Sequence, residues 1–133
     1  MVKYLLDSSA VIDVLREENI TNQNMNKALA QGNILSMCPI VYYEVVRGFK
    51  IAHATKKFEI FLELCKSWKV LPFDMRVAHK SVEIYEELHK GQQIEDNDIF
   101  IAATAIINDC ILVTSNTRHF QRVRNLNFVN WRE

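Results

Sequence analysis

Short, almost wholly apolar segments alternate along this chain with longer segments of helical periodicity. The apolar segments span residues 2–6, 34–38, 69–73, 110–114 and 128–129. Apolar runs of this length, bounded by turn-forming residues, are typical of strands buried on both faces. Strands that alternate with helices favour parallel pairing, because each helix carries the chain back across the sheet. The sequence therefore predicts an α/β domain with a mostly parallel sheet.

The segments between the strands predict helices at defined places. Pro39 suits the first turn of a helix, and Asp74 suits a helix N-cap. We expect helices at 10–16, from 39 onward, around 58–65, after Asp74 and from Asp98, together with one that ends near Gly32. A polar stretch at 17–26 and a loop at 91–97 are expected to lie outside helices.

Composition restricts the class of protein. With 133 residues and 49% hydrophobic content, the chain is expected to be one domain, 1–133, with one core. The formal net charge is zero, so overall charge does not by itself favour nucleic-acid binding. The 3 cysteines are widely spaced among apolar neighbours, which is typical of a reduced, cytoplasmic protein. No apolar run approaches the ~20 residues that span a bilayer, so no membrane partner is expected.

Three acidic residues lie beside or within apolar runs. Asp7 follows the run 2–6, Glu44 interrupts the run 40–46, and Asp98 opens the run 98–107. A carboxylate among core residues is unfavourable unless another group pairs with it. A divalent cation is a partner that three carboxylates can share. We therefore expect Asp7, Glu44 and Asp98 to bind Mg²⁺ or Mn²⁺.

The predicted architecture brings polar residues to one edge of the sheet. Asp7 ends one strand, and Asn116 follows another. Ligands of open α/β sheets bind outside the carboxyl ends of the strands. Glu44 and Asp98 lie in the first turns of their helices, so both can face this edge. The predicted site is Asp7, Glu44, Asp98 and Asn116.

Structural roles compete with this interpretation. Asp7 can serve as a helix N-cap, and Asp98 suits the positive end of a helix dipole. Glu44 can pair with Arg47 or with a lysine elsewhere. Asp13 and Asp96 are expected to be surface or capping residues, with Asp96 also an auxiliary metal ligand because it lies two positions before Asp98. Solvated helix faces are expected for His53, His79 and His89, and the basic segment 118–124 either contacts phosphates or is solvated.

Clustered carboxylates with a divalent cation indicate phosphodiester hydrolysis. The cation lowers the pKa of a bound water and polarises the phosphorus, so the expected mechanism is in-line attack by this water. No residue in the sequence has the arrangement of a covalent nucleophile with its base. Phosphatases that form an aspartyl-phosphate are disfavoured, because they require a second Asp two residues on, where this chain has Ser9.

Four sequence blocks carry a resemblance to a known family. They are Asp7-Ser-Ser-Ala-Val-Ile12 after the first strand, Tyr43-Glu-Val-Val-Arg-Gly48, Asp98-Ile-Phe-Ile-Ala-Ala-Thr-Ala105, and Leu112-Val-Thr-Ser-Asn-Thr-Arg-His-Phe120. In this order and spacing they resemble the motif blocks of PIN-domain proteins, and in particular the VapC toxins of toxin–antitoxin operons. The resemblance extends over the chain to Phe128-Val-Asn-Trp131.

The resemblance implies a three-layer α/β/α fold and a metal-dependent endoribonuclease. It implies that Asp7, Glu44 and Asp98 bind Mg²⁺ or Mn²⁺, that Asn116 takes a fourth site position with a neutral oxygen, and that the hydroxyls of Ser8 and Thr114 lie near the site. It further implies a homodimer and a cognate antitoxin whose C-terminal segment wraps the toxin, with an arginine offered to the carboxylates.

The RNA substrate is expected to be a single-stranded loop, held by basic residues around the acidic pocket. The candidates are Lys50, Lys56, Lys57, Arg118, Arg122 and Arg124. The alternative function is a catalytically inactive PIN-like module that binds RNA or protein. Three carboxylates that face phosphate disfavour this alternative, because binding alone does not need them.

Overall fold

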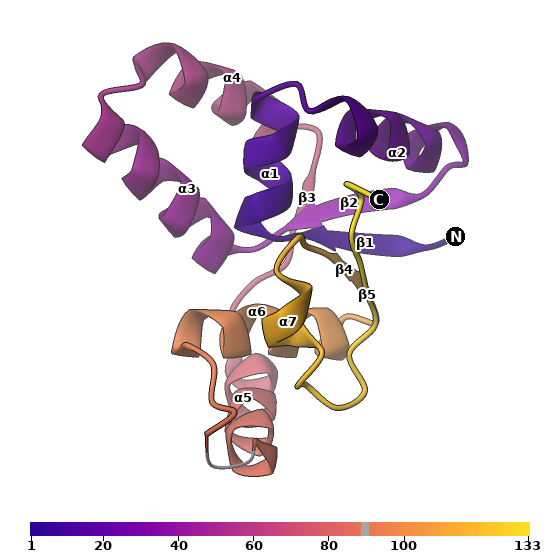
Figure 1. The fold of residues 1–133 in the computed structure, drawn as a ribbon, viewed down its shortest axis with the longest axis vertical. Coiled ribbons are helices and arrows are strands. Elements are labelled where there is room, and N and C mark those ends of the chain that lie inside the picture. The colour runs from indigo at the N-terminus through magenta and orange to yellow at the C-terminus, as the bar shows by residue number, and fades with distance from the viewer. Residues whose placement is uncertain (89–90) are drawn as a thin grey trace.

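Parallel strands form the centre of the molecule (Figure 1). The computed structural model describes residues 1–88 and 91–133. Within them, five strands pair in the order β3-β2-β1-β4-β5, and every neighbouring pair is parallel. The strands are β1 (Lys3–Leu6), β2 (Ile34–Met37), β3 (Lys69–Val70), β4 (Ile111–Val113) and β5 (Phe128–Val129). All five predicted strands are confirmed, and β3 is shorter than expected.

Helices cover both faces of this sheet, which makes the fold a three-layer α/β/α arrangement, as predicted. Figure 1 shows α1 to α4 on one side of the strands and α5 to α7 on the other. The helices are α1 (Ser8–Leu15), α2 (Asn19–Ala30), α3 (Pro39–Ala52), α4 (Thr55–Cys65), α5 (Met75–Glu87), α6 (Asp96–Ile107) and α7 (Thr117–Phe120). In the described ranges, no helix is long and apolar enough to cross a membrane.

The strand order creates a crevice at one edge of the sheet. From β1 the chain builds β2 and β3 outward on one side, and it then places β4 and β5 on the other side of β1. Ligands of open α/β sheets bind at such a reversal, outside the carboxyl ends of the strands. Here the crevice lies between the ends of β1 and β4, where the Asp7 backbone N–H donates to Val113 O at 2.9 Å.

The core explains why the central strands are apolar on both faces. Side chains of β1 and β4 pack against helices from the two outer layers. The wholly buried side chains include Leu5, Leu6, Val11, Val41, Phe61, Val77, Ile101, Leu112 and Phe120. Burial of this many large side chains supplies the main stabilisation of the fold. It also holds the carboxyl ends of β1 and β4 at fixed positions.

Three helix predictions need correction. The stretch 17–26 is largely helical, because α2 already starts at Asn19 and the Glu18 carboxylate accepts from the backbone N–H groups of Ile20 and Thr21. Helix α6 starts at Asp96, two residues before the predicted Asp98. The short α7 was not predicted as a helix. The caps explain the first error, since polar side chains at a helix start satisfy its free N–H groups.

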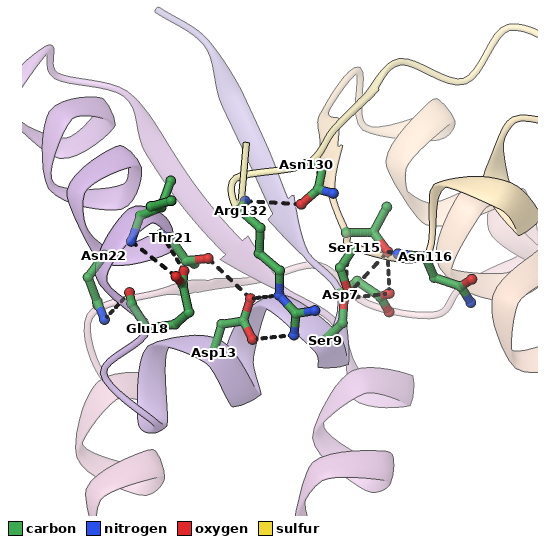
Figure 2. A network of polar contacts seen from close by, with 12 residues as sticks. Asp7, Ser9, Asp13, Glu18, Thr21, Asn22, Ser115, Asn116, Asn130 and Arg132 are labelled. Atoms are coloured by element: carbon green, nitrogen blue, oxygen red, sulfur yellow. Dashed lines mark hydrogen bonds and ion pairs between the residues drawn. The ribbon is translucent and has the colours of Figure 1, made fainter.

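The prediction that Asp13 lies at the surface or caps a helix is wrong. Asp13 is buried in α1, with 3% of its surface exposed. The Arg132 guanidinium donates to both of its carboxylate oxygens, at 2.7 and 2.6 Å, and the Thr21 hydroxyl donates at 3.1 Å. Figure 2 shows Arg132 reaching from the C-terminal segment to Asp13. The pair therefore ties the end of the chain to α1.

Of the three histidines expected on solvated helix faces, His79 is exposed on α5, and His53 is exposed just past the end of α3. The prediction for His89 lies outside the described residues.

Candidate active site

Asp7 is the most buried of the predicted site residues, with 4% of its surface exposed. It occupies the N-cap position of α1, but in the described part of the chain its side chain forms no capping hydrogen bond. Instead the Thr114 hydroxyl donates to Asp7 Oδ2 at 2.8 Å. The side chain thus points to the crevice between β1 and β4, and helix capping does not account for it.

Small hydroxyl groups hold Asp7 in place. Ser9 Oγ lies 3.4 Å from Asp7 Oδ2 and accepts from the Ser115 backbone N–H at 3.1 Å. Figure 2 shows Asp7, Ser9, Ser115 and Asn116 close together. Thr114 contacts the site as predicted. Ser9 supplies a further hydroxyl beside Asp7, and a hydrogen bond from the Ser8 backbone N–H lowers the pKa of Asp7.

Glu44 lies in the second turn of α3 and is half-buried. Its Oε1 atom is buried and has no hydrogen-bond partner among the described residues. Burial raises the pKa of Glu44, and the charges of Asp7 and Asp98 raise it further, while the Asn97 side chain acts in the opposite direction. Arg47 does not form an ion pair with it, since its guanidinium lies over the Tyr43 ring, 5.1 Å from the centroid.

Asp98 lies in the first turn of α6, where its charge is also favourable to the helix dipole. Its side chain is 16% exposed, and His119 Nδ1 lies 3.3 Å from its Oδ2. Burial raises the pKa of Asp98, and the charge of Glu95 adds to this, whereas His119 lowers it. The position of Asp98 is therefore compatible both with a stabilising interaction with the helix dipole and with a role in the site.

The charge of Asp98 acts on Asp7 and on Glu44, although the three carboxylates come from three separate elements. Burial raises the pKa of Asp7, and the charge of Asp98 contributes to the rise. The charges of Asp7 and Asp98 both raise the pKa of Glu44. In the described ranges, no three His, Cys, Asp or Glu side chains are close enough to form a complete metal-binding group. The oxygen donors still fit Mg²⁺, which keeps several waters and needs only one or two carboxylates.

His119 is a site residue that the sequence reasoning missed. Its Nδ1 lies 2.9 Å from Asn116 Nδ2, in addition to its contact with Asp98. Asn116 is the N-cap of α7, and its backbone N–H donates to Thr114 Oγ1 at 3.0 Å. The predicted fourth position is therefore linked to Asp7 through Thr114 and to Asp98 through His119. The signal for His119 was its spacing, since residues three apart in a helical turn face the same side.

Asp96 lies apart from the other carboxylates. It is exposed and lines a cavity between α5 and α6 together with Phe73 and Phe100. Glu95, three residues before Asp98, is the neighbouring acid whose charge acts on Asp98. The helical spacing explains this, because residues two apart point to different sides of a helix.

Basic side chains differ in how they lie relative to the carboxylates. Lys57 and Arg16 line a cavity of about 250 Å³ that Glu44 also lines. Arg118 is exposed on α7, next to His119. The other candidates are exposed or engaged elsewhere: Lys50 lies over the Phe58 ring, Arg122 donates to the carbonyls of Gln92 and Gln93, and Lys56 and Arg124 are exposed. Arg16 was not among the predicted candidates.

Known proteins resemble this chain over nearly its whole length. The profile of the PIN domain family matches residues 4–126. Ribonuclease VapC2 from Haemophilus influenzae is 30% identical, and the alignment covers 98% of this chain and 99% of that protein.

Solved structures show the same fold. The crystal structure of VapBC2 from Rickettsia felis, bound to a DNA fragment from its promoter, superposes with a TM-score of 0.85 and 26% identity, covering 98% of this chain and 99% of that one. A toxin–antitoxin complex from Klebsiella pneumoniae superposes with a TM-score of 0.74 and 21% identity, covering 96% and 97%. This chain therefore belongs to the PIN domain family and is related within it to the VapC ribonucleases.

Proposed function

We propose that this protein is a metal-dependent endoribonuclease that acts as the toxin of a toxin–antitoxin pair. The observation that carries the proposal is the gathering of Asp7, Glu44 and Asp98 near the switch point of a parallel sheet, where the charge of Asp98 helps to raise the pKa of Asp7 and the charges of both help to raise the pKa of Glu44. Among the described residues, the buried Oε1 of Glu44 has no hydrogen-bond partner, which supports a bound cation as its partner. The relationship to Ribonuclease VapC2 supports RNA as the substrate.

The residues proposed to hold Mg²⁺ or Mn²⁺ are Asp7, Glu44 and Asp98, with the Asn116 carboxamide oxygen as a neutral fourth donor. Oxygen-only donors of this kind suit hard divalent cations. When bound, such a cation would make a water molecule more acidic and would stabilise negative charge on the phosphodiester oxygens. Three carboxylates without a cation would repel one another, and this repulsion contributes to the raised pKa values of Asp7 and Glu44.

The protein's own contribution is to position these donors. The Thr114 hydroxyl donates to Asp7 Oδ2 and accepts from the Asn116 backbone N–H, so it fixes an acidic and a neutral donor relative to each other. Ser9 links Asp7 to the Ser115 backbone. Loss of residues that orient ligating carboxylates in this way typically lowers metal affinity by about 10- to 100-fold.

We infer that Lys57, Arg16 and Arg118 hold the phosphates that flank the cleaved bond. Lys57 and Arg16 line the cavity beside Glu44, and Arg118 is exposed beside His119. Positive side chains on both sides of an acidic pocket would keep an RNA backbone close to carboxylates that otherwise repel it. Replacement of these residues should weaken RNA binding more than the chemical step.

Cleavage of total cellular RNA tests the proposed function. The purified protein is incubated with Mg²⁺, with Mn²⁺ or with EDTA, beside the variants Asp7→Asn and Asp98→Asn. We expect fragments only with metal and only from the unaltered protein. The matched control is Asp109→Asn, because Asp109 is an exposed acid just past the other end of α6.

Two results would contradict the proposal. If Asp7→Asn cleaves RNA as well as the unaltered protein does, the proposed site is wrong. A folded, antitoxin-free protein that cleaves no RNA, including RNA from its native host, would favour the alternative of a PIN-like binding module.

We also propose that an antitoxin segment docks in the cavity between α1, α3 and α4. Its lining is mostly apolar, including Ile12, Leu15 and Phe49, and Glu44 lies at it. A partner with an apolar helix and an arginine would fill the cavity and pair with the carboxylate. The product of the adjacent reading frame should block cleavage, and Ile12→Glu should abolish this block. If the same concentration of antitoxin still inhibits RNA cleavage by the Ile12→Glu variant, the proposed docking site is wrong.

A further inference from the structure

His119 lies at the point where two candidate site residues meet. The same ring nitrogen, Nδ1, is 2.9 Å from Asn116 Nδ2 and 3.3 Å from Asp98 Oδ2. An imidazole nitrogen either carries a proton and donates or lacks one and accepts. A carboxamide nitrogen only donates, and a carboxylate oxygen only accepts. One Nδ1 atom therefore cannot satisfy both neighbours in the same state.

Two arrangements are consistent with this chemistry. With the ring proton on Nδ1, the ring donates to Asp98 Oδ2, and Asn116 must turn its oxygen toward the ring. With the proton on Nε2, Nδ1 accepts from Asn116 Nδ2. The structure has the Asn116 nitrogen against the ring, at the shorter of the two distances. In this arrangement the Asn116 oxygen points away from the ring.

The conformation of Asn116 supports a specific role for this contact. Asn116 is the N-cap of α7, a position where an asparagine side chain ordinarily accepts from the helix N–H groups. Among the described residues, its side chain forms no such bond. Its backbone N–H is held instead by Thr114 Oγ1, the hydroxyl that also holds Asp7. The residue is therefore fixed through its backbone to Asp7 and through its side chain to His119.

We propose that His119 is a positioning residue of the cation site. It holds the nitrogen of the Asn116 carboxamide against the imidazole ring, so that the carboxamide oxygen is the atom left for the cation. This inference rests on the proposed function, because it concerns the same site. His119 does not itself need to touch the cation or the RNA.

Direct measurement of metal binding tests the inference without reference to cleavage. Isothermal titration calorimetry with MnCl₂ is carried out on the purified full chain, free of antitoxin. We expect His119→Ala to weaken Mn²⁺ binding by about tenfold, the lower end of the range for loss of a group that orients a ligand. His119→Asn should bind within about threefold of the unaltered protein, because the Asn Oδ1 is attached to Cγ, as Nδ1 is, and can accept from Asn116.

A double-mutant cycle separates positioning from a general structural effect. If His119 acts through Asn116, then Asn116→Ala combined with His119→Ala should bind Mn²⁺ no more weakly than Asn116→Ala alone. His79→Ala is the matched control, because His79 is exposed on α5 and should leave the affinity unchanged. A thermal melt of each variant establishes that it is folded.

The outcomes distinguish this inference from the proposed function. Unchanged Mn²⁺ affinity in His119→Ala, or losses that add in the double variant, would overturn the positioning role alone. A tenfold loss in His119→Asn as well would also contradict it. Absence of Mn²⁺ binding in the unaltered, folded protein would overturn the proposed metal site and this inference with it.

Discussion

The Thr114 hydroxyl donates a hydrogen bond of 2.8 Å to Asp7 Oδ2, although the two residues are 107 positions apart in the chain. The bond joins the carboxyl ends of β1 and β4, the two strands between which the sheet order reverses. Asn116 is attached to the same hydroxyl through its backbone. One buried oxygen thus sets the relative positions of a candidate ligand from each side of the crevice.

The substitution Thr114→Val measures the contribution of this hydrogen bond to stability, because valine has nearly the same shape as threonine but lacks the hydroxyl. We expect the free energy of unfolding to fall by about 1–3 kcal/mol, since the buried Asp7 carboxyl loses its shortest hydrogen bond. Thr114→Ser retains a hydroxyl and should be affected less. Urea denaturation of both variants checks this expectation, and equal stability of the two would contradict it.

Asp7 should make the metal-free protein less stable as the pH rises. Its pKa is raised in the folded state above the ordinary value of 3.8, first by burial, so the folded state holds its proton to higher pH than the unfolded state does. The unfolding free energy therefore falls as the pH rises from about 3.8 through the folded pKa. Asp7→Asn removes this titration, so it should gain stability relative to the unaltered protein over that window.

Urea denaturation in EDTA, followed from about pH 4 to about pH 8, measures this difference. Addition of Mn²⁺ should then stabilise the unaltered protein and leave Asp7→Asn nearly unchanged, because a ligand stabilises only the state that binds it. The idea fails if the two proteins keep a constant difference in stability across the range, or if Mn²⁺ stabilises both equally.

Arg132 should matter for stability and not for chemistry. It is the first cause of the lowered pKa of Asp13, whose side chain is only 5% exposed in the pair. Because the Arg132 side chain is 47% exposed, solvent screens the pair, and Arg132→Met should lower the unfolding free energy by about 1–3 kcal/mol. Arg124→Met is the matched control, since Arg124 is exposed.

The pH dependence gives a second check on this pair. A lowered pKa means that the stabilisation is present above 3.8 and is lost as the pH falls from there toward the folded pKa. The difference between Arg132→Met and the unaltered protein should therefore shrink in acid. A difference that persists or grows below that value would show that the packing of Arg132, and not its charge, is responsible.

The exposed face of α5 is where we expect the predicted homodimer to form. Met75, Val82 and Tyr85 are 67%, 58% and 62% exposed on this face. The N-terminal half of α5 carries Arg76 and Lys80, while its C-terminal half is acidic at 83, 86 and 87. Two antiparallel copies of α5 would place each half against the opposite charge, and a two-fold interface of this kind is self-complementary.

Val82→Glu should convert such a dimer to a monomer, because it places a charge in the apolar centre of the interface. Ile51→Glu is the control, since Ile51 is 74% exposed at the end of α3, away from α5. Sedimentation velocity gives the mass of each. A dimer that survives Val82→Glu, or an unaltered protein that is monomeric, would rule out this interface.

The sequence was most informative where a local rule was sufficient. Pro39 and Asp74 mark helix starts that the structure confirms, with the Asp74 carboxylate accepting from the Val77 N–H. The apolar runs identify the strands, because strands buried on both faces admit few polar side chains. The position of Asp7 at the end of such a run was enough to direct attention to the crevice.

Residues whose role depends on distant partners were missed or misplaced. Asp13 was expected to be a surface or capping residue, because its ion-pair partner, Arg132, lies 119 positions away in the chain. His119 went unrecognised as a site residue because its contact with Asp98 joins residues 21 positions apart in the chain. The auxiliary role of Asp96 stays a prediction, and Glu95 is the acid that acts on Asp98.

The sequence by itself determined the parallel α/β architecture and the set of acids that needed a partner, because apolar periodicity and the free energy of burying a carboxylate are local properties of the chain. Only the tertiary structure decided which hydroxyl holds Asp7, that His119 lies between Asn116 and Asp98, and that Arg132 neutralises Asp13. These contacts depend on the order of the strands and on the rotation of each helix about its axis. The rotation of a helix about its axis determines the direction in which each of its side chains points. The packing of the whole core, and not the local sequence, determines this rotation.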